Sequence, residues 1–205
     1  MPGKLLTFEG IDGSGKSTQA ARSLDYLHSR GVDSVLLREP GGTVIGERIR
    51  HLLLDVSHKE MAPLTELFLY LAARSQITSE IIRPHLDNGI SVVMDRYYDS
   101  TTAYQGFARG LGHEAVAGLN RIATECLSPD MTIVFDCPVE TAFSRMNSAH
   151  DRLESEGIEF MRRVRDGFRS IGEMDPGRVV VVDGSRPADS VFEDVRRMLD
   201  SLYGW

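Results

Sequence analysis

The chain has 205 residues, of which 41% are hydrophobic and 26% charged, a composition typical of a globular domain with a full core. Its formal net charge of −7 argues against a surface built for nucleic acid, so no nucleic-acid partner is expected. The two cysteines, Cys126 and Cys137, have neither the spacing of metal ligands nor that of a disulfide framework. No apolar run is long enough to span a membrane, and the first predicted strand starts too early to leave room for a signal peptide. A cytoplasmic protein without a membrane partner is therefore expected.

The first recognisable element is a strand, a glycine-rich loop and a helix in succession. The apolar residues 5–8 predict a strand, and residues 18–29 carry apolar side chains at helical spacing. Between them, residues 10–17 fit the pattern G-x-x-x-x-G-K-S/T, in which backbone N–H groups cradle phosphate at the start of a helix. An ordinary glycine turn is the alternative, but the flanking strand and helix are those that the motif requires. The loop predicts binding of a nucleoside triphosphate.

Each position of this loop has an expected role. Lys16 is expected to reach the β- and γ-phosphates, and the Ser17 hydroxyl to hold Mg²⁺. The other residues expected to contact ATP here are Gly10, Ile11, Asp12, Gly13, Ser14, Gly15 and Thr18.

Strand and helix patterns alternate along the rest of the chain. Further buried strands are predicted at residues 34–38, 90–94, 131–135 and 178–182. Helices are predicted at residues 44–54, 63–86 (ending near Pro84), 113–127, 138–146, 158–171 and 190–202. Residues 99–112 are predicted to form a polar loop and residues 147–157 an exposed, mobile segment. Together these patterns predict one α/β domain over residues 1–205, with a five-stranded parallel sheet flanked by helices on both faces and a short lid at about residues 146–157.

Charged residues follow the strands at the edge where open α/β sheets bind ligands. Arg38 and Arg96 each stand just past a strand, where a guanidinium can bind phosphate through two parallel hydrogen bonds; a surface or ion-paired arginine is the alternative. Asp95 ends an apolar strand, where a carboxylate can orient Mg²⁺ through its waters, although it could instead cap a helix. The N-K-x-D element of regulatory GTPases does not occur in the chain. The pattern favours a small-molecule kinase.

From Leu5 to its C-terminus the chain resembles the bacterial thymidylate kinases. The matching segments are Phe8-Glu-Gly-Ile-Asp-Gly-Ser-Gly-Lys-Ser-Thr18, Arg38-Glu-Pro-Gly-Gly-Thr43, Leu71-Ala-Ala-Arg74, Asp95-Arg-Tyr97, Ala103-Tyr-Gln-Gly106, Asp151-Arg152 with Glu154, and Arg163-Val-Arg165. Many unrelated proteins share the phosphate loop, whereas the later motifs together are specific. The resemblance implies a P-loop NTPase fold of the nucleoside monophosphate kinase type, transfer of the γ-phosphate of ATP to dTMP giving dTDP and ADP, Mg²⁺ as cofactor, and a homodimer.

The resemblance also implies a set of site residues. Those implied to act in catalysis are Lys16, Arg38, Arg96 and Arg152. Those implied to bind dTMP are Asp12, Arg38, Pro40, Tyr70, Arg74, Arg96, Thr101, Tyr104 and Gln105, with a possible cis peptide before Pro40. Tyr70 is implied to stack on the thymine ring, although an aromatic residue at helical spacing is more often core, and Arg74, one turn later, to read a base carbonyl. Tyr104 is implied to crowd the 2′ position of the sugar.

Thymidylate kinases differ at the position that Gly13 occupies in this chain. Some thymidylate kinases carry an arginine at this position, and others supply the cation from the mobile segment, as this chain is implied to do. Arg152 is the first candidate and Arg145 the second, although either could be a solvated lid charge. Arg186 lies in a segment that matches the loop beside the adenine of ATP. The alternatives are a kinase of dUMP, UMP or CMP and a non-catalytic nucleotide-binding module, which would have no need for acceptor-side arginines.

Overall fold

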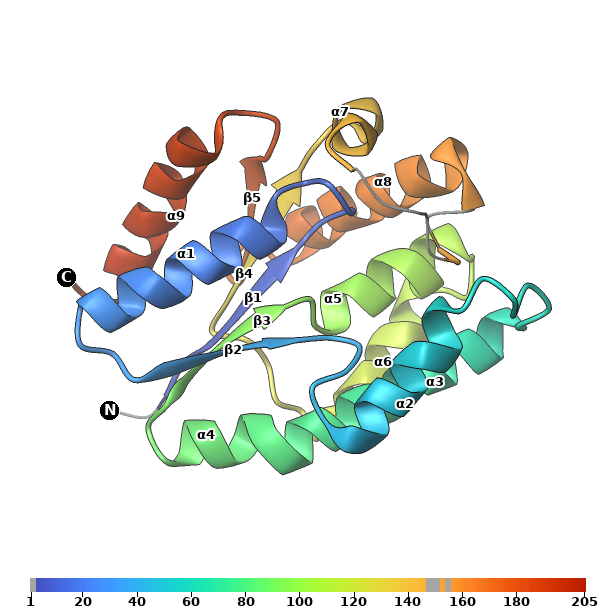
Figure 1. Ribbon diagram of the computed structural model, residues 1–205, viewed down its shortest axis with the longest axis horizontal. Coiled ribbons are helices and arrows are strands. Elements are labelled where there is room, and N and C mark those ends of the chain that lie inside the picture. Colours follow the sequence, from blue (N-terminus) through green and yellow to red (C-terminus); the bar gives the residue numbers. More distant parts are fainter. Residues whose placement is uncertain (1–2, 147–151, 154–155) are drawn as a thin grey trace.

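The computed structural model describes residues 3–146, 152–153 and 156–205. Its centre is a five-stranded sheet in the order β2-β3-β1-β4-β5, with every neighbouring pair parallel (Figure 1). The strands are β1 (Leu5–Glu9), β2 (Ser34–Arg38), β3 (Ser91–Asp95), β4 (Met131–Asp136) and β5 (Val179–Asp183). The predicted α/β fold and all five predicted strands are confirmed.

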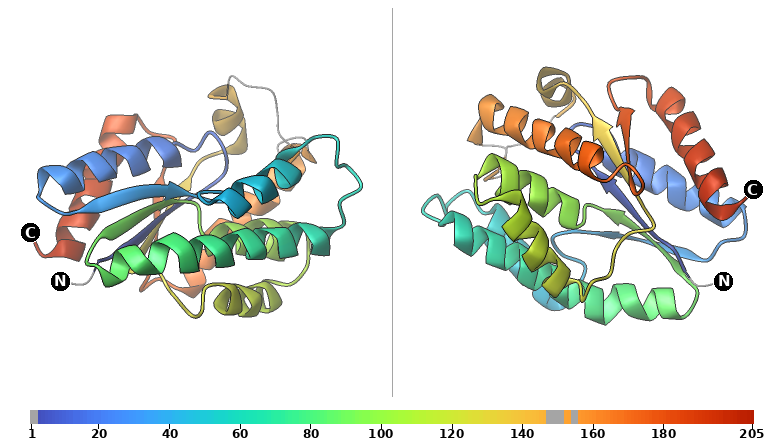
Figure 2. Two further views of the ribbon diagram at one scale, coloured as in Figure 1. Left: turned by 60° about the horizontal axis from the view of Figure 1, so that its bottom comes forward. Right: turned by 180° about the vertical axis from the view of Figure 1, so that it is seen from behind.

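Helices cover both faces of this sheet. The α-helices are α1 (Lys16–Ser29), α2 (Val44–Leu54), α3 (Pro63–Ile77), α4 (Arg83–Asp87), α5 (Tyr98–Thr101), α6 (His113–Ala123), α7 (Val139–Ser144), α8 (Ile158–Met174) and α9 (Ala188–Tyr203), and the π-helical segments are η1 (Thr78–Ile82) and η2 (Thr102–Ala108). Helices α1 and α9 lie on one face, while α8 and α6 lie in front of the sheet when the molecule is seen from behind (Figure 2). Side chains alternate along β1 accordingly: Leu6 and Phe8 pack toward α1 and α9, whereas Leu5 packs with Ile77 on the other side.

The prediction of a polar loop over residues 99–112 is wrong, because α5 and η2 make residues 98–108 helical. The polar side chains that suggested a loop are buried instead. Thr101 and Gln105 are each 1% exposed and form hydrogen bonds to residues of α3. Their polarity reflects the site that they line and not contact with solvent.

The predicted helix over residues 63–86 is three helical segments in succession, α3, η1 and α4. At its centre the backbone N–H of Arg83 donates to the carbonyl of Thr78, five residues back, which is the π pattern. Pro84 lies in the first turn of α4, where a missing N–H is tolerated, so the helix continues past it to Asp87. The helix predicted over residues 113–127 ends at Ala123, because Glu125 and Cys126 adopt positive φ values of 50° and 60°.

Among the described residues, no helix combines the length and apolar character needed to cross a membrane.

A buried carboxylate lies where β1 meets the phosphate loop. Glu9 accepts hydrogen bonds from the backbone N–H of Tyr97 (2.7 Å) and the hydroxyl of Ser100 (2.5 Å). Burial, reinforced by the charge of Asp99, raises the pKa of Glu9 from 4.5 to about 8. The folded protein therefore keeps a proton on Glu9 at neutral pH that the unfolded chain releases.

This proton predicts a pH dependence of stability. Because the native state binds one more proton than the unfolded state between pH 4.5 and about 8, the free energy of unfolding should fall as pH rises through this window. The slope should reach at most about 1.4 kcal/mol per pH unit. Glu9→Gln should flatten this slope in urea denaturation followed across the window, whereas Glu125→Gln at an exposed position should retain it. An unchanged slope in Glu9→Gln would contradict the assignment.

Candidate active site

The glycine-rich loop over residues 10–17 connects β1 to α1. Helix α1 begins at Lys16, directly after Gly15 in the left-handed conformation with φ 95°. The first turn of this 14-residue helix directs backbone N–H groups and the positive end of its dipole toward the loop. The strand, loop and helix that a phosphate-binding motif requires are therefore present.

No side chain fits at Gly13. Its φ is 79°, and a Cβ atom there would lie 2.1 Å from the carbonyl oxygen of Ala142 on α7. Because α7 packs directly on the loop, a charge could not be placed at position 13 without moving that helix. A further positive charge near the loop must come from another element.

Asp12 holds two cations beside each other. Its Oδ1 lies 2.8 Å from Lys16 Nζ and 2.6 Å from Arg96 Nη2. Burial raises the pKa of Asp12, but the charges of Arg96 and Lys16 outweigh it and hold the pKa well below its usual range. The ionised carboxylate thus links the phosphate loop to the end of β3.

Arg96 is fixed by its backbone and by its side chain. Its φ of 70° is unusual for a non-glycine residue, and its N–H donates to the carbonyl of Phe8 (3.0 Å). Its Nη1 donates to the carbonyl of Gly10 (3.0 Å) and to the hydroxyl of Ser100 (3.1 Å). The guanidinium also lies 5.4 Å from the ring centroid of Tyr104. Arg96 therefore stands between the loop and the neighbouring cavity.

Ser17 and Asp95 meet as the metal prediction requires. The Ser17 hydroxyl donates to Asp95 Oδ2 at 2.5 Å, and within the described part of the chain the buried Asp95 Oδ1 has no hydrogen-bond partner. No group of three or more His, Cys, Asp or Glu side chains in that part could hold a metal ion. A hydroxyl and one carboxylate fit Mg²⁺, which takes most of its ligands from water and phosphate.

A cavity lies beside the loop, with about 540 Å³ of empty space when its mouth, which is open to solvent, is included. Its lining includes eight residues expected to bind the acceptor: Asp12, Pro40, Tyr70, Arg74, Arg96, Thr101, Tyr104 and Gln105. They come from the phosphate loop, the segment after β2, α3, the end of β3, and α5 with η2. The peptide bond before Pro40 is cis, as the resemblance suggested.

Arg74 is held in the wall of this cavity by four hydrogen bonds. Its Nη1 donates to Thr101 Oγ1 (2.7 Å) and Asn120 Oδ1 (2.9 Å), and its Nη2 to Glu39 Oε2 (2.6 Å) and the carbonyl of Tyr97 (3.1 Å). Among the described residues, Nε is the guanidinium nitrogen that lacks an acceptor, so its N–H is the donor left for a ligand. Burial raises the pKa of Glu39 although the charge of Arg74 opposes the shift.

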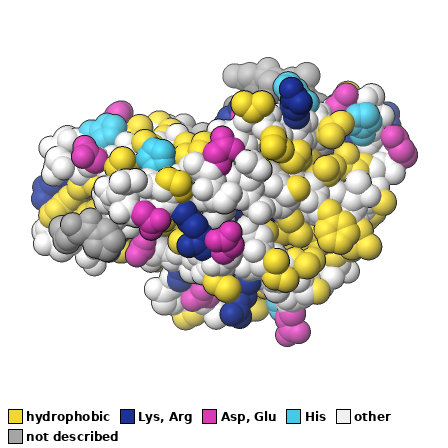
Figure 3. All heavy atoms as spheres, turned by 90° about the horizontal axis from the view of Figure 1, so that it is seen from below, with side chains coloured by type: hydrophobic (Ala, Val, Ile, Leu, Met, Phe, Trp, Pro, Cys, Tyr) yellow, Lys and Arg dark blue, Asp and Glu magenta, His cyan; other side chains and the backbone are white. Residues whose placement is uncertain are grey.

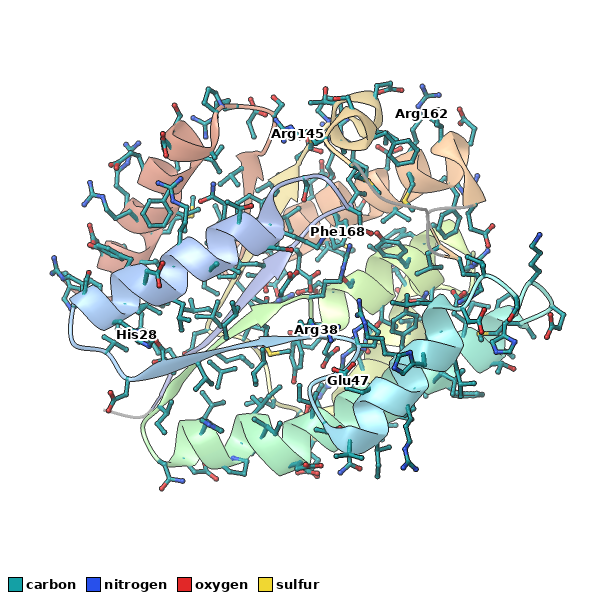
Figure 4. All side chains as sticks on the ribbon, viewed as in Figure 1. His28, Arg38, Glu47, Arg145, Arg162 and Phe168 are labelled. Carbon is teal, nitrogen blue, oxygen red and sulfur yellow. The ribbon has the colours of Figure 1, made fainter. Side chains whose placement is uncertain are left out.

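Arg38 does not line the cavity. Its side chain is about half exposed and its Nη2 lies 3.1 Å from Glu47 on α2 (Figure 4). Arg50, one turn further along α2, lines the cavity and donates to the carbonyl of Pro40 (3.0 Å). The sequence reasoning missed Arg50, and missed Glu39 as well. The available signal for Arg50 was its place on the helix that directly follows the Pro40 segment.

Arg145 and Arg186 border a second hollow on the opposite side of the loop. Arg145, at the end of α7, donates to the carbonyls of Gly184 (2.8 Å) and Ser185 (2.7 Å) and reaches to 3.5 Å from the carbonyl of Gly13. The hollow is also lined by Ser14, Gly15 and Thr18, and the side chain of Arg186 forms an ion pair with Asp194 on α9. The structure thus brings both residues to the side of the loop where the resemblance places adenine, while Ile11 is buried in the core.

Arg152 and Leu153 are the two described residues in the centre of the predicted lid. Each is 7% exposed, so the prediction of an exposed segment is wrong for both; residues 147–151 and 154–155 lie outside the described residues. Arg152 Nη2 lies 2.7 Å from Glu66 Oε2, and its Nε donates to the carbonyl of Leu53 (2.8 Å). The charge of Arg152 can be buried because it is paired with the carboxylate of Glu66. Its guanidinium is on the acceptor side of the site.

A phosphate loop whose Asp12 also lines the neighbouring cavity and pairs there with Arg96 defines a P-loop kinase of small molecules. Comparison with known proteins agrees, since a family model for thymidylate kinase matches residues 8–195. The chain belongs to the thymidylate kinase family. It is 44% identical to the thymidylate kinase of Sulfurihydrogenibium sp. (strain YO3AOP1), in an alignment that covers 98% of this chain and 97% of that one. It is 42% identical to the thymidylate kinase of Carboxydothermus hydrogenoformans, in an alignment that covers 100% of both chains. The crystal structure of thymidylate kinase from Ehrlichia chaffeensis superimposes with a TM-score of 0.81 at 34% identity, over 98% of this chain and 99% of that chain.

Proposed function

We propose that this protein transfers the γ-phosphoryl group of ATP to dTMP, giving dTDP and ADP. The observation that carries the proposal is the shared wall between the phosphate loop and the cavity, where Asp12 Oδ1 bridges Lys16 and Arg96. A triphosphate on the loop and a monophosphate in the cavity would both reach this pair of cations. Membership of the thymidylate kinase family supports dTMP as the nucleotide that the cavity binds.

The reaction needs positioning and charge neutralisation more than proton transfer. The acceptor is a phosphate monoester, whose second pKa of about 6 leaves it nucleophilic at neutral pH without a general base. Lys16 would hold the β- and γ-phosphates, and Arg96 would orient the acceptor phosphate with its planar, two-pronged guanidinium. Because Arg96 is already fixed to Gly10 and Ser100, little reorganisation is needed when the acceptor binds.

Mg²⁺ is proposed as the cofactor, with Ser17 and Asp95 as the residues that would hold it. Bound there with the triphosphate, the ion would neutralise charge on the phosphate oxygens. The hydrogen bond between the two side chains keeps both oxygens at one place beside Lys16 before nucleotide binds.

The experiment that tests the proposal is ADP release from ATP and Mg²⁺ with dTMP, dUMP, UMP, CMP and AMP offered separately. Turnover with dTMP well above the other four is the expected result. Preference for UMP or CMP would instead indicate a different pyrimidine monophosphate kinase. ATP binding without ADP release for any acceptor would indicate a nucleotide-binding module.

The position of Arg145 supports it as the donor-side arginine. Arg145→Ala is expected to raise KM for ATP by roughly 10-fold, because a charge-assisted contact beside the loop is lost, and to leave KM for dTMP unchanged. Steady-state kinetics with each substrate varied separately check this. An unchanged KM for ATP would contradict it.

Arg152→Ala serves as the comparison variant, and a catalytic role for Arg152 stays a prediction. If Arg152 moves to the triphosphate during turnover, the variant should lose kcat. If Arg152 remains paired with Glu66, the loss should be in thermal stability, because a buried carboxylate loses a partner.

A homodimer is proposed to form through α3 and α6. Leu64 and Phe68, one turn apart on α3, are 54% and 56% exposed, and Ile122 on α6 is 76% exposed. Seen from below, hydrophobic side chains gather over the right-hand part of the molecule, the side on which Figure 1 shows α2, α3 and α6 (Figure 3). Light scattering should give twice the chain mass, and Phe68→Asp should give the monomer. Met174→Asp, at a position exposed to a similar degree on α8, should leave the dimer intact.

A further inference from the structure

Glu66 is a buried carboxylate behind the cavity wall. It lies in the first turn of α3, is 1% exposed and is not among the residues that line the cavity. Its Oε1 accepts hydrogen bonds from Gln105 Nε2 at 2.8 Å and from Arg109 Nε at 3.2 Å. Its Oε2 lies 3.1 Å from Arg109 Nη2 and 2.7 Å from Arg152 Nη2. One buried carboxylate is thus surrounded by Gln105 and two arginines.

The charge state of Glu66 decides how Gln105 is oriented. Burial raises the pKa of Glu66, but hydrogen bonds from Arg109 and Gln105 and the charges of Arg109 and Arg152 outweigh burial and lower it. An ionised carboxylate only accepts hydrogen bonds, so the Gln105 amide must turn its NH₂ group toward Glu66. Gln105 lines the cavity, so the carbonyl oxygen of its side chain is then the group left to accept from a ligand.

We propose that Glu66 is a specificity-determining positioning residue: by holding the NH₂ group of Gln105, it presents the carbonyl of that side chain to the base of the acceptor. A carbonyl accepts the N3–H of thymine or uracil but repels N3 of cytosine, which has a lone pair and no proton. Glu66 thereby selects pyrimidines with a protonated N3 without touching them. The inference rests on the proposed function, since it concerns the base of the same acceptor nucleotide.

Arg109 provides a matched control for this inference. Its guanidinium pairs with Glu66 and with Glu156 (2.6 Å) and lies 4.7 Å from the ring centroid of Phe160. Replacing it removes one of the two donors to Glu66 Oε1 and part of the charge around Glu66, but keeps the carboxylate that accepts from Gln105. An effect specific to amide orientation should therefore appear on replacing Glu66 and not on replacing Arg109.

The test compares kcat/KM for dTMP, dUMP and dCMP in the whole protein. In Glu66→Gln, residue 66 can donate as well as accept, so Gln105 is free to turn, and the ratio of dTMP to dCMP should fall by roughly 10-fold or more. The value for dUMP should fall together with that for dTMP, because both bases carry N3–H. Arg109→Gln should keep the ratio of wild type. An unchanged ratio in a Glu66→Gln protein that still phosphorylates dTMP would overturn the inference, whereas a wild type inactive on dTMP would overturn the proposed function itself.

A second measurement on the wild type does not depend on the folding of any variant. In a ¹H–¹⁵N spectrum, the side-chain amide protons of Gln105 should be protected from solvent exchange and should move little when dTMP binds, because they face Glu66. A large shift of these protons on binding would show that the NH₂ group faces the base, and would overturn the inference.

Discussion

Lys16→Ala is expected to lower kcat for phosphoryl transfer by about 10³-fold, because Lys16 is the cation that the loop places against the β- and γ-phosphates. The side chain is nearly buried and its Nζ lies 2.8 Å from Asp12. Stability should change little, since Asp12 keeps its contact with Arg96 at 2.6 Å and is not left buried without a partner. Single-turnover kinetics and thermal unfolding check the two halves of this prediction.

The control for Lys16 is Lys59→Ala, at an exposed position before α3. It should behave as wild type in both assays. A Lys16→Ala enzyme that keeps more than about one tenth of the wild-type kcat would be incompatible with the loop as the phosphate site.

Arg96→Ala is expected to lower kcat/KM for the acceptor by about 10²- to 10³-fold and to leave KM for ATP much less affected. The loss has two sources, since Arg96 supplies the forked donor on the acceptor side and fixes Asp12 against the loop. Arg96→Lys should recover only a small part of the activity, because an ammonium keeps the charge but not the planar fork. The measurement is initial rates with the acceptor varied at saturating ATP.

Arg83→Ala is a matched control for Arg96, since Arg83 also binds backbone carbonyls and a carboxylate but lies away from the site. It should keep wild-type kcat/KM. Near-wild-type activity in Arg96→Ala would contradict the assignment of the cavity beside Arg96 as the acceptor site.

The parts of the fold that the sequence predicts well are those with local causes. The five strands are short apolar runs with clear ends, and the phosphate loop is continuous in sequence, so each is readable without knowledge of its neighbours. The sequence does not reveal residues 98–108 as helical, because the polar side chains Thr101 and Gln105 form their hydrogen bonds with α3, which is distant in sequence. Composition alone cannot distinguish such buried polarity from exposure to solvent.

The same distinction between local causes and packing of distant segments applies to the candidate site. Eight acceptor-side residues converge on one cavity because their motifs lie at strand ends and on the helices that follow. Arg38 and Arg152 do not line the cavity, and each side chain is paired with a carboxylate on another element, Glu47 for Arg38 and Glu66 for Arg152. Arg50 and Glu66 belong to no motif that names their role, and only the packing of α2 and α3 around the cavity brings them to the site.

The most direct test of the central claim follows the transferred phosphoryl group. The protein is incubated with Mg²⁺, dTMP and ATP labelled with ³²P at the γ-phosphate, and the labelled products are separated. We expect the label to appear in dTDP, at a rate equal to the release of ADP. Label released as inorganic phosphate without dTDP, or no transfer of label at all, would contradict it.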